Sequence, residues 1–417
     1  MIGDGDARRL RRVDEIPRRG QGRRKRVQPV REARRAVRVD GIGRAGDAAV
    51  AQQRRIAALL RIDRRGDDLW FLYTGGTTGV SKGATLLNRN VVSNVAQVEA
   101  WFQPALGTAG DTQLNFLGIL PLYHIFAMVA CNMVGMRYGA CSLLVPNPRD
   151  IPGLVKELTT FKVNVFPCLN TLFNALANNA EFAKLDFSGL KLTLSGGMAT
   201  QRPVAERWAK MTGSAIVEGY GLSETSPVAT CNLSTLKGFT GSIGYPIPST
   251  EIAIRDDAGT DVKLGEPGEI CIRGPQVMAG YWNRPDETAH VMTADNYFKS
   301  GDVGVMDPDG SIRIVDRKKD MVLVSGFNVY PTEIEEVVMT HPGVLETAVI
   351  GVPDPHSGEV VKLFVVKKDP ALTEADLHEF LKGQLTGYKR PKYIEFRNDL
   401  PKSPVGKILR RELRPKD

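Results

Sequence analysis

The chain has 417 residues, of which 42% are hydrophobic and 24% are charged, and its formal net charge is +8. This length is enough for two or three domains with a large core, and the composition is ordinary for a soluble globular protein. The five cysteines are scattered without a C-x-x-C pair, which excludes a disulfide framework and a cysteine zinc site and suits a reducing cytosol.

The opening residues are polar and charged, so the sequence predicts no signal peptide. The most apolar stretch, residues 114–145, is interrupted by Pro121, His124, Asn132 and Arg137. It therefore lacks the roughly 18 uninterrupted apolar residues that a spanning helix needs, and we expect buried strand and helix there.

Residues 1–65 differ from the rest of the chain. They contain 20 Lys and Arg against 8 Asp and Glu and no aromatic residue, whereas the remainder contains 35 against 39. Such a segment is predicted to be largely disordered. Three interpretations stay open: a basic arm for nucleic acid or anionic lipid, a transit peptide, or sequence foreign to the original protein, such as a misread frame. We favour the third, and because the body is mildly acidic we do not expect nucleic acid as a partner.

Strands and helices alternate from about residue 67, which is typical of an α/β domain. The expected elements are a strand at residues 69–73, a helix at 90–102, and buried strands at 115–121, 163–167 and 190–194. Ser195, Gly196 and Gly197 follow the last of these strands, at the position where α/β sheets bind ligands.

The pattern changes after residue 229. Residues 243–272 are rich in Gly, Pro and β-branched residues, which predicts a β-barrel-like subdomain. The elements expected beyond it are a strand at 312–315, a helix at 331–339, strands at 344–352 and 360–366, and a helix capped by Thr373 and Asp376. The predicted fold class is therefore a large α/β domain at 66–316 with a β-barrel-like subdomain, followed by a small α+β domain at 317–417.

A loop rich in Gly and Thr joins two apolar runs near the start of the large domain. Its letters over residues 73–84 are YTGGTTGVSKGA. Glycine lets a backbone approach a ligand, successive N–H groups form an anion nest, and the hydroxyls and Lys82 add donors and charge. The loop fits neither G-x-x-x-x-G-K-[ST] nor G-x-G-x-x-G. It predicts a phosphate-binding loop, with a flexible turn between strands as the alternative.

Residues 218–225, EGYGLSET, hold a second group of polar side chains. Tyr220 can stack on a nucleobase and Ser223 can donate to a phosphate oxygen. Glu224 is the kind of hard oxygen ligand that Mg²⁺ takes beside phosphates. A structural turn is the alternative for this segment alone.

Three later residues are further candidates. Asp302 is expected to end a strand, where a carboxylate can accept from ribose hydroxyls, although such an aspartate is more often a cap. Arg317 offers a fork for ribose or phosphate, with a surface salt bridge as the alternative. Lys407, in a lysine-rich loop, can deliver an ammonium to a phosphate whose charge grows in the transition state. A solvated tail lysine is the alternative there.

Together these residues resemble the adenylate-forming superfamily, and within it the bacterial long-chain fatty acid–CoA ligases. The resemblance runs from about residue 67 to 415. Seven blocks match the family in order, at residues 73–84, 120–128, 218–227, 268–282, 298–307, 314–335 and 401–413. One Gly-rich loop would be weak support, whereas seven ordered blocks are specific.

The resemblance implies an acyl-CoA synthetase-like fold with a mobile C-terminal domain. It also implies a two-step reaction, in which ATP and a medium- or long-chain fatty acid give an acyl-adenylate and CoA then displaces AMP. The implied cofactors and substrates are ATP, Mg²⁺, CoA and the fatty acid.

The family's motifs also imply roles for individual residues. The β- and γ-phosphates would be held by Thr74, Gly75, Gly76, Thr77, Thr78, Gly79, Ser81 and Lys82. Ser223 would bind the α-phosphate, and Glu224 would bind the Mg²⁺. The adenine would be flanked by Gly196, Gly197 and Tyr220, and the ribose would be held by Asp302 and Arg317. Lys407 would assist adenylation, Lys319 would be the domain hinge, Gly326 would lie by the CoA arm, and His124 would gate the acyl tunnel.

The sequence departs from the family at its front, where only about 70 residues precede the Gly-rich loop. We expect strands of the large domain to be missing. Two alternatives to the ligase stay open: a fatty acyl-AMP ligase, and an inactive fragment with a basic binding arm. The expected location is the cytoplasm, and a homodimer and peripheral contact with the inner face of the membrane are both compatible with the resemblance.

Overall fold

The computed structural model describes residues 82–403 and 407–414, and the backbone alone of residues 69–74. The predictions for residues 1–65 and for loop residues 75–81 lie outside these described residues.

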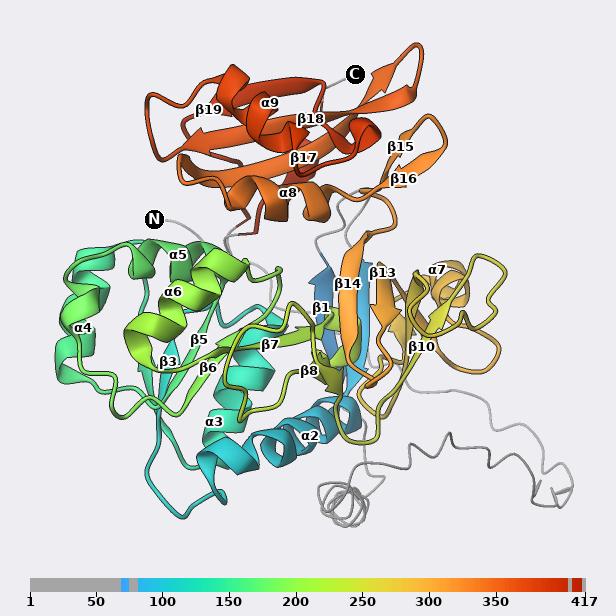
Figure 1. Cartoon of the computed structure of the whole chain (residues 1–417). Coiled ribbons are helices and arrows are strands. Elements are labelled where there is room, and N and C mark those ends of the chain that lie inside the picture. The colour runs from blue at the N-terminus through green and yellow to red at the C-terminus, as the bar shows by residue number, and fades with distance from the viewer. Residues whose placement is uncertain (1–68, 75–81, 404–406, 415–417) are drawn as a thin grey trace, which may run out of the picture. The chain divides into compact units, whose positions relative to one another are not determined.

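A seven-stranded sheet forms the centre of the large domain (Figure 1). Its strands, in spatial order, are β4 (Cys141–Leu144), β3 (Asn115–Gly118), β5 (Val165–Cys168), β6 (Leu192–Ser195), β7 (Ile216–Gly221), β8 (Val228–Cys231) and β9 (Tyr245–Pro246). The strands from β4 to β7 are parallel, while β8 and β9 join antiparallel. The strands expected at 163–167 and 190–194 are thus confirmed as β5 and β6, and the strand expected at 115–121 ends earlier, at Gly118.

Helices cover both faces of this sheet, because its buried strands present apolar side chains on both sides. One face carries α4 (Ile151–Thr160), α5 (Asn170–Ala177) and α6 (Arg202–Thr212); the other carries α2 (Asn88–Leu106) and α3 (Val134–Arg137) (Figure 1). Neighbouring residues of one strand accordingly enter different cores: Phe166 packs with the first group of helices and Val165 with the second. A π-helix, Phe126–Met133, precedes α3.

Two smaller antiparallel sheets complete the large domain. The three-stranded sheet contains β1 (Leu69–Thr74), β2 (Lys82–Leu87) and β12 (Gly280–Tyr281), so β1 and β2 flank the predicted phosphate loop. The four-stranded sheet contains β10 (Glu251–Arg255), β11 (Gly268–Arg273), β13 (Phe298–Met306) and β14 (Ile312–Arg317), and α7 (Pro285–Val291) lies between β12 and β13 in the chain. Strands β10 and β11 lie within residues 243–272, where the sequence predicts a β-barrel-like subdomain; the structure has an open sheet there, which also takes in β13 and β14.

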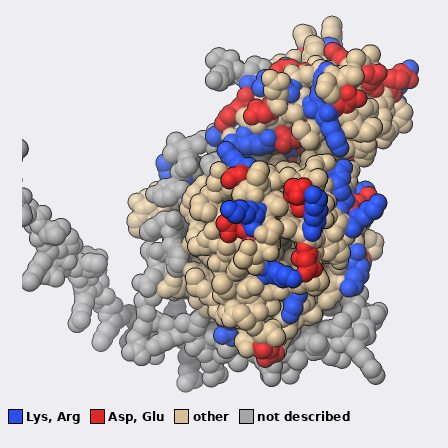
Figure 2. Space-filling model, turned by 90° about the vertical axis from the view of Figure 1, so that its left-hand side faces the viewer, with Lys and Arg blue, Asp and Glu red and all other residues tan. Residues whose placement is uncertain are grey.

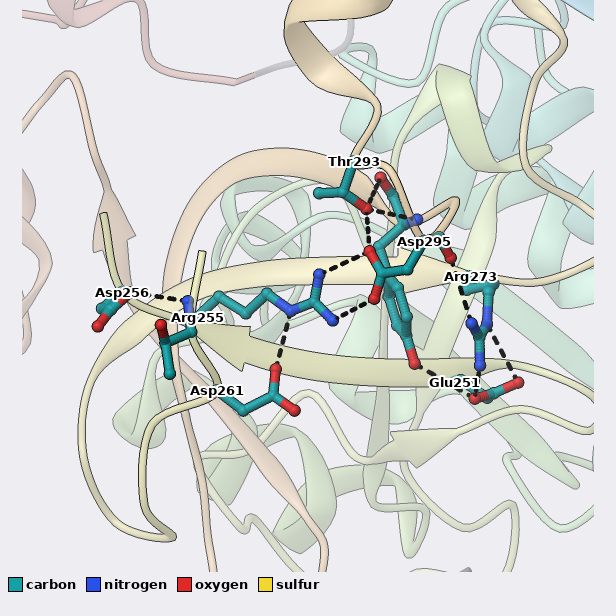
Figure 3. A network of polar contacts seen from close by, with 9 residues as sticks. Glu251, Arg255, Asp256, Asp261, Arg273, Thr293 and Asp295 are labelled. Atoms are coloured by element: carbon teal, nitrogen blue, oxygen red, sulfur yellow. Dashed lines mark hydrogen bonds and ion pairs between the residues drawn. The ribbon is translucent and has the colours of Figure 1, made fainter. Parts of the chain in front are cut away.

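An ion-pair network lies on the four-stranded sheet, around Arg255 of β10 and Arg273 of β11 (Figure 3). The Arg255 guanidinium donates to both carboxylate oxygens of Asp295, at 3.0 and 2.6 Å, and to Asp261 at 2.8 Å. Arg273 pairs with Glu251, and both guanidinium groups lie 4.5 Å from the ring centre of Tyr297. The network therefore holds the segment before β13 against β10 and β11.

The C-terminal domain is built on a five-stranded sheet. It contains β15 (Val322–Val324), β16 (Phe327–Val329), β17 (Val344–Asp354), β18 (Gly358–Lys367) and β19 (Tyr393–Arg397), with helices α8 (Pro331–Met339) and α9 (Glu374–Lys382). Both helices pack on one face of β17 and β18, and the segment after β19 packs on the other through Leu400, Ile408 and Leu413. The capping pair Thr373–Asp376 is confirmed.

The prediction that Asp302 ends a strand is wrong. Asp302 lies inside β13, which continues to Met306, and it pairs in register with Arg317 of β14. Its strand is irregular, because Gly301 adopts a φ of +75° and the register with β14 shifts between Val303 and Gly304. Because these two irregularities interrupt the strand pattern, the sequence around Asp302 resembles the end of a strand.

No helix among the described residues is both long and apolar enough to cross a membrane. On the face drawn in Figure 2, Lys and Arg lie interspersed with Asp and Glu over the described surface.

Candidate functional site

Several of the predicted site residues lie at the carboxyl ends of the parallel strands. Gly196 and Gly197 follow β6 directly, and the short turn Ser223–Thr225 follows β7. A Cβ at Gly196 would lie 3.3 Å from the ring of Phe126, and Gly197 has a φ of +80°. Both positions therefore favour glycine, which leaves the backbone at this edge open to close approach by a ligand.

Glu224 is a buried carboxylate at this edge, with 7% of the residue exposed. Its Oε1 accepts a hydrogen bond from the Tyr281 hydroxyl at 2.8 Å, and its carbonyl oxygen accepts from the Met278 N–H at 2.8 Å. Burial raises the pKa of Glu224, an effect that the Tyr281 hydroxyl and Lys82 oppose. A divalent cation would stabilise the ionised form of such a group.

Among the described residues no group of three or more His, Cys, Asp or Glu is arranged to hold a metal ion alone. Mg²⁺ usually binds through one or two carboxylates together with substrate phosphates. A single buried carboxylate such as Glu224 therefore fits Mg²⁺ that arrives with a nucleotide.

Lys82 begins β2 and pairs in register with Thr74 of β1, across the predicted phosphate loop. Its Nζ lies 2.5 Å from Glu287 of α7 and 5.1 Å from the ring centre of Tyr281. Lys82 is therefore brought next to Tyr281 and, through it, to Glu224. The remaining loop residues, 75–81, lie outside the described part of the chain.

Asp302, Tyr220 and Arg317 form one cluster. The Tyr220 hydroxyl donates to Asp302 Oδ2 at 2.7 Å, and Arg317 Nε lies 3.4 Å from Asp302 Oδ1. Tyr220 and Asp302 are buried, with 8% and 6% of each residue exposed, while Arg317 is half-buried. The phenol thus orients a carboxylate whose other oxygen faces a guanidinium.

Lys407 is close enough to this cluster to interact electrostatically with Asp302 and Arg317. Burial lowers the pKa of Lys407 to about 7, and the positive charges of Arg317, Arg410 and Lys319 add to the effect while Asp302 opposes it. His124 lies before the π-helix, and its pKa is lowered by burial and then by the charge of Lys407. The structure therefore brings both predicted residues into one electrostatic neighbourhood.

The predicted hinge and CoA residues lie in the segment after β14. Lys319 follows the strand, and its pKa is lowered by burial and then by Arg317. Gly326 lies in the turn between β15 and β16 with a φ of +84°, next to Phe327, whose ring stacks on that of Tyr388 at 4.7 Å. Among the described residues, no hydrogen bond or ion pair links Gly326 to Glu224 or Asp302.

Sequence reasoning missed three residues of the site. Tyr281 and Glu287 contact Glu224 and Lys82, and Glu218 is a buried carboxylate that accepts from the Thr200 N–H at 2.9 Å. Tyr281 and Glu218 lie inside blocks that match the family, which is the signal that could have marked them. Glu287 pairs with Lys82 across 205 residues, and its spacing gives no such signal.

This fold and this cluster define the class of protein. The model of the family described as AMP-binding enzyme matches residues 21–282, and the model described as AMP-binding enzyme C-terminal domain matches residues 333–407. The chain therefore belongs to the AMP-binding enzyme family, and its fold is that of the acyl-CoA synthetase-like adenylate-forming enzymes.

Two curated relatives define the class more closely. The chain is 56% identical over 349 residues to a long-chain-fatty-acid–CoA ligase of Escherichia coli O157:H7, covering 84% of this chain and 62% of the relative. It is 40% identical over 364 residues to the ligase of that name from Bacillus subtilis strain 168, and the match covers 87% of this chain and 64% of that relative. The resemblance to bacterial long-chain fatty acid–CoA ligases is thus confirmed, and the chain spans about 62% of the length of the first of these relatives.

A solved structure shares the fold over most of the chain. The crystal structure of ATP-bound MatB from Rhodopseudomonas palustris superposes with a TM-score of 0.76 at 32% identity, covering 85% of this chain and 69% of that one.

Proposed function

We propose that this protein activates a long-chain fatty acid with ATP to an acyl-adenylate and then transfers the acyl group to CoA. The observation that carries the proposal is the 56% identity to long-chain-fatty-acid–CoA ligases, together with the clustering of Tyr220, Asp302, Arg317 and Lys407 in the described structure. The bound substrates would be ATP with Mg²⁺, the fatty acid and CoA.

The residues around the cluster divide into groups that hold different parts of the nucleotide. The loop from Thr74 to Lys82 would hold the β- and γ-phosphates, and Ser223 the α-phosphate. Glu224 would hold Mg²⁺, which neutralises phosphate charge when it is bound.

The base and the sugar would lie along the strand ends. Gly196 and Gly197 would flank the adenine. The Tyr220 hydroxyl donates to Asp302. We therefore infer that the Tyr220 ring contacts the adenine, while its hydroxyl orients the Asp302 carboxylate that binds the ribose. Arg317 would donate to the same ribose from the paired strand.

Lys407 would stabilise the negative charge that develops when the fatty carboxylate attacks the α-phosphate. We place the boundary between the two domains at residues 316/317, because the apolar cores on the two sides use residues 84–314 and 322–413 separately. A turn about Lys319 would withdraw Lys407 and bring Gly326 to the CoA arm, since each half-reaction needs its own closed site. His124 would border the acyl group.

The direct test supplies the protein with ATP, Mg²⁺, CoA and palmitate and measures AMP and palmitoyl-CoA. Formation of both, dependent on all four components, is the expected result. Accumulation of palmitoyl-adenylate without consumption of CoA would favour a fatty acyl-AMP ligase. No palmitate-dependent AMP, with no protection of the protein by ATP against thermal unfolding, would favour an inactive fragment and overturn the proposal.

The role of Lys407 has a separate test with a matched control. Lys407→Ala is expected to slow palmitate-dependent exchange of pyrophosphate into ATP by about 10²- to 10³-fold, the loss typical of one transition-state donor. Lys402→Ala is the control, because Lys402 lies in the same loop but pairs with Glu346 at 2.7 Å. Equal rates for wild type and Lys407→Ala would exclude the role.

ATP and CoA are cytoplasmic substrates and long acyl chains partition into bilayers. We therefore propose that the protein works in the cytoplasm and meets its acid at the inner membrane surface. A flotation assay with vesicles that contain palmitate tests this: recovery of the protein with the vesicles is expected, and its absence from them contradicts the membrane contact.

A further inference from the structure

Arg410 lies three residues after Lys407, in the short turn Arg410–Glu412. The apolar side chains of Ile408 and Leu413 on either side of it pack against the sheet of the C-terminal domain. The segment that carries Lys407 is therefore anchored by apolar contacts, and Arg410 adds a charged contact between them.

The Arg410 guanidinium faces three carboxylates. Its Nε and Nη2 lie 3.2 and 2.7 Å from the two oxygens of Glu335, and its Nη1 lies 3.5 Å from Asp320 and 3.7 Å from Asp316. All four side chains are largely buried, with exposed fractions of 19% for Arg410, 15% for Glu335 and Asp320, and 1% for Asp316. Planar, bidentate pairing of this kind needs the arginine fork and is not reproduced by lysine.

The three carboxylates belong to elements that also set the position of the hinge. Asp316 accepts from the N–H of Arg317 at 2.6 Å and from the N–H of Thr332 at 2.8 Å, which joins the end of β14 to the start of α8. Glu335 of α8 also accepts from the Val349 N–H of β17 at 2.8 Å. One guanidinium therefore connects the Lys407 segment to β14, to the residues beside Lys319, and to α8.

We propose that Arg410 is a positioning residue, which holds the segment of Lys407 against the hinge in the arrangement that serves the first half-reaction. This inference rests on the proposed function. The second half-reaction would not need Lys407 at the α-phosphate, so loss of Arg410 should affect the two half-reactions unequally. A residue that merely stabilised the C-terminal domain would affect both alike.

The experiment compares Arg410→Gln and Arg410→Lys with wild type and with Arg411→Gln. Arg411 is a matched control, because its ion pair with Glu412 is 3.9 Å long and lies at the surface. The first half-reaction is followed as palmitate-dependent pyrophosphate exchange, and the second as formation of palmitoyl-CoA from synthetic palmitoyl-adenylate. Hydrogen–deuterium exchange of the C-terminal peptide that contains Lys407 gives a readout that does not depend on activity.

Arg410→Gln is expected to slow the first half-reaction by about 10²-fold, the size that a misplacement of about 1 Å can cause. The second half-reaction should stay within about twofold, while exchange in the Lys407 peptide should become faster. Arg410→Lys should fall between wild type and Arg410→Gln, and Arg411→Gln should match wild type.

Equal loss in both half-reactions, or an unchanged first half-reaction and unchanged exchange in Arg410→Gln, would overturn the positioning role. If the wild type itself shows no palmitate-dependent exchange of pyrophosphate, the proposed function fails instead. The hydrogen–deuterium comparison then still decides whether Arg410 holds the segment.

Discussion

Lys407 combines a depressed pKa with a neighbourhood rich in positive charge. Burial is the main cause, Arg317, Arg410 and Lys319 add to it, and the resulting pKa is about 7. The ammonium is therefore present below pH 7 and is lost as the pH rises through this value. Because the charged form would stabilise the transition state, the first half-reaction should slow as the pH rises through about 7.

The measurement is the pH dependence of kcat/KM for ATP in pyrophosphate exchange, which reports groups of the free protein. Lys407→Ala should be slow and should lack the alkaline decline near pH 7. An alkaline decline of the same shape in wild type and Lys407→Ala would show that another group causes it.

Glu218 gives a second dependence on pH, this time of stability. Burial raises the pKa of Glu218 from 4.5 to about 7, with the Thr200 N–H opposing the shift and Glu336 adding to it. Between these two values the folded protein holds a proton that the unfolded chain releases, so Glu218 lowers stability progressively as the pH rises through this window. Glu218→Gln cannot ionise and keeps an acceptor for Thr200, so it should unfold at a higher urea concentration than wild type at pH 8.

At pH 5 the two proteins should differ much less than at pH 8, because the pH lies only slightly above the pKa of 4.5 in the unfolded chain and most of the destabilisation develops between there and pH 7. Glu181→Gln serves as a control, since Glu181 is 68% exposed and pairs only with Lys184 at the surface in the described structure. A difference between Glu218→Gln and wild type that is the same at pH 5 and pH 8 would contradict the shifted pKa.

At the scale of elements, α5 and α6 are fixed to the central sheet by an aromatic cluster. Trp208 is fully buried, with ring centres 4.7 Å from Phe173, 5.1 Å from Phe166 and 5.4 Å from Phe182. Trp208→Ala would remove these contacts and leave a cavity, so it should lower the free energy of unfolding by about 3–5 kcal/mol. Urea unfolding measures this, with Trp282→Ala as the control at a position that is 47% exposed. A loss under about 1 kcal/mol for Trp208→Ala would mean that the cluster collapses without cost.

Elements with a simple pattern could be read from the sequence. Pro331 at the first turn and apolar positions through Met339 predict α8 with the bounds that it has. The run at Val165–Cys168, with the letters VFPC, has the unbroken apolar character of a buried parallel strand. Strand β13 could not be read in this way, because Gly301 and the shifted register interrupt its alternation, and Asp302 was therefore placed at an end that does not exist.

Contacts between distant elements were also beyond sequence reasoning. Motif blocks indicate which segments carry the candidate nucleotide-binding residues, but Tyr220 contacts Asp302 across 82 residues, and Tyr281 contacts Glu224 across 57. Whether Tyr220 offers its ring or its hydroxyl depends on this packing, which the local letters do not contain.

At the scale of the whole molecule, β4 is the first strand of the seven-stranded sheet and bears exposed apolar side chains. Leu144 is 54% exposed and Cys141 is exposed as well, and Met136 of α3, the helix that precedes β4 in the chain, is 72% exposed. An apolar strand at a sheet edge promotes association between chains. We therefore expect the protein to self-associate as its concentration rises, and Leu144→Lys to reduce this association.

Size-exclusion chromatography with light scattering measures the mass across a concentration series, under reducing conditions so that Cys141 cannot cross-link. Leu264→Lys is the matched control, because Leu264 is 62% exposed but lies between β10 and β11. A monomer at every concentration, or the same association in the Leu144→Lys and Leu264→Lys variants, would refute the role of the β4 edge.

The pairing of Asp302 with Arg317 brings a final consequence for the working cycle. Arg317 is the last residue of β14, and Lys319 follows it by two positions, so the residue proposed to hold the ribose and the proposed hinge lie at the same strand end. Release of the product AMP and rotation of the C-terminal domain would then be coupled instead of independent. If so, saturating AMP should lengthen the lifetime of one lobe orientation in single-molecule fluorescence; lifetimes indifferent to AMP would separate the two motions.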